Sequence, residues 1–226
     1  MNEQNPYRKK ELSSSQLETY NRNYYDTLEW RTITYKGIPV YKYPADLITY
    51  QQLIYDVMPD VIIETGSCTG GSALFFYDTM VSYGIKNPKV ISIEKRININ
   101  EVSPLEKENI TFIEDSSLSM EVLNEIRESI KNKKVLVSLD SDHIEDHVIK
   151  ELNVYSTFVS LNSYIIVEDT FLGEYAPIGP HTIFYNGDNP KGAVDKFLSY
   201  NNKFIIDKKY EKVFSMNPKG YLKRIL

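Results

Sequence analysis

From residue 44 onward, short apolar runs alternate with segments in which apolar residues recur every three or four positions. The first such segment can begin at Pro44-Ala45-Asp46 and has to end before Pro59. Its apolar positions have helical spacing: Leu47, Tyr50, Leu53, Ile54 and Val57. The same spacing predicts helices over about 72–83, 119–131, 144–158 and 193–200. Five short runs between them predict strands over 61–64, 90–94, 110–114, 135–139 and 164–167.

These strand candidates are apolar at almost every position, which is typical of parallel strands covered by helices on both faces. We therefore predict an α/β fold with a Rossmann-like, doubly wound and mostly parallel sheet. Residues 204–207 and 213–216 are expected to close it as an antiparallel pair. An irregular segment between Phe171 and Pro190 contains three prolines and three glycines. It is expected to be a substrate lid carrying Tyr175, His181 and Tyr185, or else a disordered loop.

The pattern separates residues 1–40 from residues 41–226. The first part is polar and rich in tyrosine, with weak helical character from Ser15 to Trp30. We expect it to be an N-terminal extension that serves as a lid or as a contact in a homo-oligomer. The second part is expected to be one catalytic domain.

The composition narrows the function classes. The chain has 226 residues and a formal net charge of −5, and no cluster of basic residues suggests a nucleic-acid partner. No apolar run approaches the roughly 20 residues that span a bilayer, and the polar N-terminus does not resemble a signal peptide. The single cysteine, Cys68, excludes an internal disulfide. We expect a cytoplasmic protein with a small-molecule or glycan substrate.

Polar and glycine residues at three successive strand ends predict a site for a nucleoside-bearing cofactor. In doubly wound sheets, ligands bind beyond the carboxyl ends of the strands. The first run ends in a glycine-rich turn whose backbone can approach a ligand closely, and the next two runs end in acids suited to a ribose and an adenine. The candidate residues are Glu64, Gly66, Ser67, Gly70, Ser72, Glu94, Asp115 and Ser116. The pattern is not G-x-G-x-x-G, although a nicotinamide-dependent oxidoreductase would share Glu94 and the sheet.

Three further acids follow the fourth and fifth runs. Asp140 ends one run, while Glu168 and Asp169 end the next. Carboxylates that converge at one sheet edge repel one another unless a cation lies between them, and an all-oxygen set suits Mg²⁺, with Mn²⁺ or Ca²⁺ as substitutes. The alternative is that these acids cap helices or face solvent.

His143 follows Asp140 closely, and Asp142 with Glu145 resembles a capping box. This predicts His143 in the first helical turn, where the helix dipole and a nearby cation would keep it neutral and able to accept a proton. The alternative is a histidine bonded to solvent or backbone. His147 lies on the same helix face, but the pair does not match H-E-x-x-H, so zinc hydrolysis is disfavoured.

Four segments carry a resemblance to a known family. Tyr43-Pro44-Ala45-Asp46-Leu47, Val61 through Gly66, Leu139 through His143 and Val167 through Thr170 resemble the cephalosporin hydroxylase family, which includes rhamnosyl O-methyltransferases of the class I type. The resemblance covers roughly residues 40 to 225. It implies S-adenosylmethionine bound along the Glu64–Gly71 loop, Glu94 and Asp115. The acids are also similar in arrangement to those of macrolide sugar and catechol O-methyltransferases.

Together these features predict a metal-dependent O-methyltransferase of carbohydrate or polysaccharide biosynthesis. A sugar diol would bind the metal held by Asp140, Glu168 and Asp169, with His143 and Asp140 as catalytic residues. The alternatives are the oxidoreductase and a cofactor-binding scaffold without catalysis.

Overall fold

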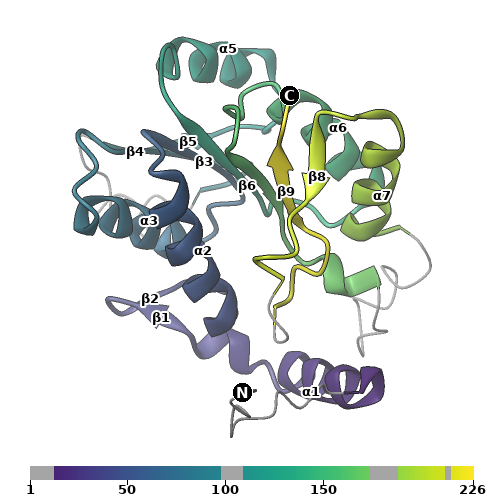
Figure 1. Cartoon of the computed structure of the whole chain (residues 1–226). Helices are drawn as coiled ribbons and strands as arrows, with labels where there is room; N and C mark the ends of the chain where they lie inside the picture. The colour runs from purple at the N-terminus through teal and green to yellow at the C-terminus, as the bar shows by residue number, and fades with distance from the viewer. Residues whose placement is uncertain (1–12, 98–108, 174–187, 212–214) are drawn as a thin grey trace, which may run out of the picture.

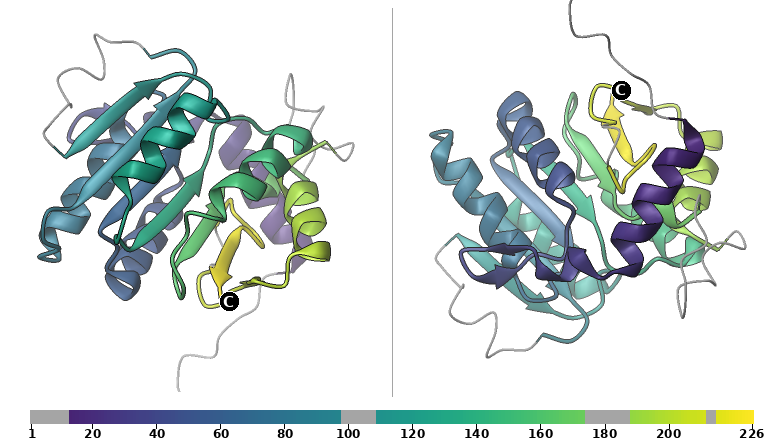
Figure 2. Two further views of the ribbon diagram at one scale, coloured as in Figure 1. Left: turned by 90° about the horizontal axis from the view of Figure 1, so that it is seen from above. Right: turned by 90° about the horizontal axis from the view of Figure 1, so that it is seen from below.

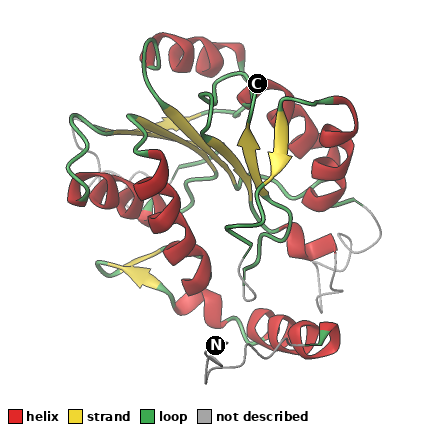
Figure 3. Ribbon diagram, in the orientation of Figure 1, coloured by secondary structure: helices red, strands yellow, loops and turns green. Residues whose placement is uncertain are grey.

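The computed structural model of the chain describes residues 13–97, 109–173, 188–211 and 215–226. A seven-stranded sheet runs through the molecule, with helices packed on both of its faces (Figures 1 and 3). In chain order its strands are β3 (Val61–Thr65), β4 (Lys89–Glu94), β5 (Ile110–Glu114), β6 (Val135–Leu139), β7 (Tyr164–Val167), β8 (Phe204–Ile206) and β9 (Tyr221–Arg224).

The strand order across the sheet is β5-β4-β3-β6-β7-β9-β8. The five strands from β3 to β7 are parallel to their neighbours, whereas β9 pairs antiparallel with both β7 and β8. The chain runs outward from β3 to β5 and then returns to place β6 on the other side of β3. The strand order therefore reverses between β3 and β6, and ligands bind beyond such a point in doubly wound folds.

The helices form two layers (Figure 2). One face is covered by α2 (Pro44–Val57) and α3 (Gly71–Ser82), and the other by α5 (Met120–Ser129), α6 (Glu145–Tyr155) and α7 (Pro190–Tyr200). Each layer has its own buried apolar cluster, centred on Ile62 on the first face and on Ile63 on the second. Alternate residues of a strand point to opposite faces, so the apolar run of β3 serves both layers. This confirms the predicted Rossmann-like, mostly parallel sheet.

The N-terminal part folds back toward the C-terminal half of the molecule. It contains α1 (Ser14–Asp26), the 3₁₀ turn η1 (Glu29–Thr32) and a hairpin of β1 (Thr34–Tyr35) and β2 (Ile38–Pro39). Tyr24 and Tyr25 of α1 pack with Phe171, which lies in the 3₁₀ turn η3 (Thr170–Gly173). Residues 1–12 lie outside the described part, so the role of the extension as a lid or oligomer contact stays a prediction.

The second strand of the terminal pair was predicted at the wrong place. Ser215 and Met216 are irregular, and the partner of β8 is β9, further along the chain. Residues 212–214 lie outside the described residues. The buried Asp46 carboxylate accepts hydrogen bonds from the Ser215 hydroxyl at 2.5 Å and from the Met216 backbone at 2.9 Å. These groups therefore bond to α2 rather than to a strand ladder.

The sequence also predicted that no segment spans a membrane and that a lid lies between Phe171 and Pro190. Among the described residues, none of the helices combines the length and the apolar character that a bilayer span requires. Residues 174–187, which include Tyr175, His181 and Tyr185, lie outside the described residues, so the structure does not test the predicted lid.

Gly66 makes the closest backbone approach at the switch point. Its φ of 91° is in the left-handed region, and a Cβ added there would lie 2.0 Å from the carbonyl oxygen of Asp140. We expect Gly66→Ala to lower the free energy of unfolding by about 3 kcal/mol or more, because the turn after β3 or that after β6 has to move. Urea denaturation measures this change.

Gly84→Ala is the matched control. Gly84 also has a positive φ, of 74°, but nothing lies within 4 Å of its added Cβ. Gly84→Ala should lower the free energy of unfolding by only about 1 kcal/mol. Equal effects of the two substitutions would mean that the close approach at Gly66 does not constrain the fold.

Candidate active site

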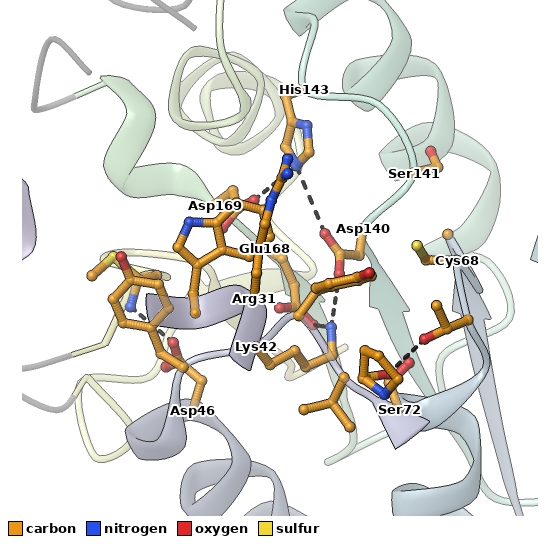
Figure 4. A pocket seen from close by; sticks show the side chains of 18 of the residues that line it. Arg31, Lys42, Asp46, Cys68, Ser72, Asp140, Ser141, His143, Glu168 and Asp169 are labelled. Carbon is orange, nitrogen blue, oxygen red and sulfur yellow. Dashed lines mark hydrogen bonds and ion pairs between the residues drawn. The ribbon is translucent and has the colours of Figure 1, made fainter. Parts of the chain in front are cut away.

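A cavity of about 480 Å³ opens at the carboxyl ends of β3, β6 and β7 (Figure 4). The switch point places it there, because the turns that follow these strands meet at one edge. The Asp140 backbone amide donates to the carbonyl of Thr65 at 2.9 Å, and the Glu168 amide donates to that of Leu139 at 3.0 Å. These bonds extend the parallel ladders by one residue, and so place Asp140 and Glu168 side by side.

Asp140, His143 and Asp169 form a cluster that lines the cavity. The Nε2 atom of His143 lies 2.9 Å from Asp169 Oδ2 and 3.7 Å from Asp140 Oδ1. One potential ligand atom from each of the three lies within 4.8 Å of the others. In Figure 4 the imidazole stands over the two carboxylates. The sequence predicted that Asp140 and Asp169 converge with Glu168 and that His143 lies near them as a base, whereas the clustered residues are Asp140, His143 and Asp169.

The turn that carries Asp169 is supported from the C-terminal segment. Asp169 has a φ of 55°, a left-handed conformation that aspartate tolerates better than most residues. Its backbone amide donates to Oδ1 of the buried Asn217 at 2.9 Å. A Cβ at Gly220 would lie 2.2 Å from the carbonyl oxygen of Val167, so the same segment packs closely against the end of β7.

His143 does not lie in a helix, contrary to the prediction. The helix α6 begins at Glu145 with Ile144 as its N-cap, and the Glu145 amide donates to Asp188 at 2.8 Å. The predicted capping box is therefore absent, and His143 precedes the helix instead of lying in its first turn. Burial opposes a charge on His143, but its hydrogen bonds to Asp140 and Asp169 raise its pKa to about 10.

Glu168 occupies a different position from the other two acids. Its Oε1 atom accepts hydrogen bonds from Lys42 Nζ at 2.6 Å, the Tyr50 hydroxyl at 2.5 Å and the Ser138 hydroxyl at 3.0 Å. Burial raises the pKa of Glu168 to about 8, although Lys42 opposes this shift. Glu168 lines the cavity but is not one of the three residues that cluster there.

Lys42 was missed by the sequence reading. Its side chain is 1% exposed, and its ammonium also lies 2.8 Å from Asp140 Oδ2. Burial would lower the pKa of Lys42, but Asp140 and Glu168 raise it well above the ordinary lysine value. The same ion pair holds the pKa of Asp140 below its usual value despite burial. Lys42 thus serves as a counter-ion to both Asp140 and Glu168, so convergence of the acids alone does not require a metal.

The cofactor candidates lie in two adjoining cavities. Gly66, Ser67 and Ser72 line the main one, while a second cavity of about 280 Å³ is lined by Asp115 and Ser116. Glu94 and Ser141 line both. The glycine-rich turn and the ends of β4 and β5 therefore line two cavities that share Glu94 and Ser141.

The two remaining candidates, Glu64 and Gly70, belong to the turns and do not line a cavity, and Asp115 in the second cavity is already hydrogen-bonded. Glu64 is fully buried and accepts from the Ser92 hydroxyl at 2.5 Å, and Gly70 is the N-cap of α3 with a φ of 79°. The Asp115 carboxylate already accepts from the Ser116 amide and the Ser119 hydroxyl. Neither Glu64 nor Gly70 lines either cavity.

Aromatic side chains from the segment before α2 form an aromatic wall of the main cavity. Tyr25 stacks on Trp30 with ring centroids 5.7 Å apart, and Tyr41 meets Trp30 edge-on at 5.8 Å. The Arg31 guanidinium lies 5.0 Å from the Trp30 ring. The sequence pattern does not connect these aromatic residues with the site. They line it because η1 folds over the carboxyl ends of the strands.

Comparison with known proteins identifies the family. The family model described as Rhamnosyl O-methyltransferase/CmcI matches residues 27–225. The rhamnosyl O-methyltransferase of Mycobacterium leprae is 31% identical over 221 residues, covering 94% of this chain and 92% of that protein. Its counterpart from Mycobacterium tuberculosis is 28% identical over 218 residues, covering 94% and 86%.

Solved structures agree with the fold. An apo-structure of CmcI superposes with a TM-score of 0.61 at 20% identity, covering 87% of this chain and 77% of that one. An O-methyltransferase from Bacillus cereus superposes with a TM-score of 0.51 at 11% identity, covering 95% and 92%. The chain is therefore an S-adenosylmethionine-dependent O-methyltransferase. Within that class it belongs to the rhamnosyl O-methyltransferase/CmcI family, as its motifs predicted.

Proposed function

We propose that this methyltransferase acts on a hydroxyl of a sugar, or of a sugar-bearing natural product, with the help of a divalent cation. One observation carries the proposal: a single cavity joins the glycine-rich turn after β3 to the Asp140, His143 and Asp169 cluster. The names of the relatives specify a rhamnosyl acceptor, and a CmcI structure contains both Mg and S-adenosylmethionine. These names support a sugar acceptor and a metal for this chain.

The methyl donor would lie along the two adjoining cavities. Glu94 lines both of them and is placed to accept the hydroxyls of a ribose, with Asp115 and Ser116 lining the far cavity. The turn from Gly66 to Ser67 is close to Asp140, so the amino-acid end of the donor would lie beside the acid cluster. The reactive methyl would then face the acceptor end of the main cavity.

The acid cluster fits a divalent cation. Asp140 and Asp169 offer carboxylate oxygens with ligand atoms within 4.8 Å, and the cavity leaves room for water and substrate oxygens, as Mg²⁺ prefers. Glu168, the third predicted ligand, retains one oxygen that no described residue bonds, and that oxygen completes the proposed set. When bound, such a cation lowers the pKa of a coordinated hydroxyl and fixes the direction of attack.

His143 is the proposed acceptor of the hydroxyl proton. It borders the cavity and lies next to both Asp140 and Asp169. A positive charge on these same carboxylates repels imidazolium, which favours the neutral ring that can take a proton. Asp140 Oδ1 lies 3.7 Å from Nε2 of this ring, so the negative charge of Asp140 acts on the ring from close by.

The aromatic wall supplies the acceptor end. Tyr25, Trp30 and Tyr41 line the cavity, and aromatic side chains of this kind combine an apolar body with a polar tip, which suits the mixed C–H and hydroxyl surface of a sugar. The proposed acceptor would therefore be held between this wall and the acid cluster.

Ligand-dependent unfolding and methyl transfer test this function together. We expect S-adenosylhomocysteine at 100 times its Kd to stabilise the chain by about 2.7 kcal/mol, and NAD to leave the melting temperature unchanged. Transfer of labelled methyl from S-adenosylmethionine to a panel of rhamnosides and other glycosides should require Mg²⁺ and stop with a chelator. Stabilisation by NAD alone would favour an oxidoreductase, and transfer unaffected by chelator would contradict the metal.

A further inference from the structure

Lys42 lies in the short connection between β2 and α2, and both ends of that connection are held. At one end, the Thr69 hydroxyl donates to the carbonyl of Pro39 at 2.6 Å, and a Cβ at Gly71 would lie 2.1 Å from the same oxygen. At the other end, Pro44 begins α2. The backbone of Lys42 is therefore fixed against the start of α3 while its side chain reaches the ends of β6 and β7.

The ammonium of Lys42 takes one oxygen from each of two carboxylates. It bonds Oδ2 of Asp140 and Oε1 of Glu168, which also accepts from Tyr50. The other oxygens remain: Oδ1 of Asp140 faces His143, and no described residue bonds Oε2 of Glu168. A lysine ammonium is a compact charge with three donors, which lets it serve two carboxylates at once.

We propose that Lys42 is a positioning residue: its ammonium engages one oxygen each of Asp140 and Glu168 and so presents the second oxygen of each to the cation and the acceptor. This inference rests on the proposed function. Lys42 does not touch the reacting atoms in it. Residues that orient metal ligands in this way typically affect metal affinity or activity by about 10- to 100-fold.

Lys42→Met tests the proposal, because methionine keeps much of the length and removes the charge. We expect Mn²⁺ binding, followed by electron paramagnetic resonance in the absence of donor, to weaken at least about 10-fold. With Mg²⁺, kcat should fall about 10- to 100-fold while KM for S-adenosylmethionine changes less than about threefold. Lys36→Met is the matched control, since Lys36 is exposed and pairs with Asp78 outside the cavity.

Chemical rescue separates positioning from a general contribution to stability. In Lys42→Ala, n-propylammonium replaces the missing methylenes and charge, and should restore kcat at least about fivefold and Mn²⁺ binding with it, whereas n-propanol should not. Lys42→Gln serves if Lys42→Met does not fold. Circular dichroism and S-adenosylhomocysteine binding report on folding in each variant.

The outcomes separate the two proposals. Unchanged or tighter Mn²⁺ binding in a folded Lys42 variant overturns the positioning role but leaves the proposed function intact. Loss of the folded spectrum and of S-adenosylhomocysteine binding in Lys42→Met, Lys42→Gln and Lys42→Ala also overturns it, in favour of a structural role. A wild-type chain that neither binds Mn²⁺ nor transfers methyl groups contradicts the proposed function, and this inference with it.

Discussion

Asp140→Asn is expected to lower kcat by about 10³-fold or more, which corresponds to about 4 kcal/mol of transition-state stabilisation. Asp140 contacts both Lys42 and His143, and it is one of the proposed cation ligands. The amide keeps the shape but removes the negative charge that holds these groups. Because the metal fixes and activates the acceptor, the loss should appear in kcat more than in the KM of the donor. Steady-state kinetics with Mg²⁺ measure both.

Asp146→Asn is the matched control for this substitution. Asp146 is an exposed acid in the first turn of α6 that pairs with Lys150, and it lies outside the cavity. Its activity should remain within about twofold of wild type, as is usual for exposed pairs of small energetic effect. If Asp140→Asn kept activity within tenfold of wild type in the presence of chelator, the role of Asp140 at the metal would be wrong.

The sequence could predict the strand ends because the pattern that marks each end is local. Each apolar run is bounded by polar residues, and parallel strands bring such ends together regardless of the chain between them. Glu94, Asp140 and Asp169 were placed in this way, and the structure puts all three on the main cavity.

The sequence pattern could not identify Lys42 as a site residue because its partners are distant in sequence. It is 98 positions from Asp140 and 126 from Glu168, and neither strand pattern points toward it. One signal was present: Lys42 is a charge among apolar residues, between Val40-Tyr41 and Tyr43, directly before a helix start. A lysine in such a place is buried only with a counter-ion. The acids at the strand ends were the counter-ions available.

The errors came from side chains that satisfy distant backbone groups. The Glu145 amide bonds Asp188, so Asp142 caps the Ile144 amide instead of a helical turn. In the same way the Asp46 carboxylate accepts a hydrogen bond from the Met216 amide, so this amide cannot pair with a neighbouring strand. Local patterns predict which residues can cap or pair, whereas tertiary contacts decide which of them do.

His143→Ala is expected to lower kcat by about 10²- to 10⁴-fold, the usual contribution of a general base. Mn²⁺ affinity should change less than about threefold, because in the proposed mechanism the carboxylates hold the cation and the imidazole takes the proton. S-adenosylhomocysteine binding should also persist, since His143 lines the main cavity but not the second one. Added imidazole should restore part of kcat in this variant.

His147→Ala is the control for the same change four positions away. His147 lies 3.2 Å from the Ser141 hydroxyl and 3.4 Å from Glu151, and it lines the second cavity rather than the main one. His147→Ala is therefore expected to change the KM of the donor, while kcat stays within about threefold of the wild-type value. The Mn²⁺ measurement decides the role of His143, because its ring nitrogen is also close enough to Asp140 and Asp169 to be a ligand. If His143→Ala weakened Mn²⁺ binding as much as Asp140→Asn does, His143 would be a metal ligand, and the proton would need another acceptor.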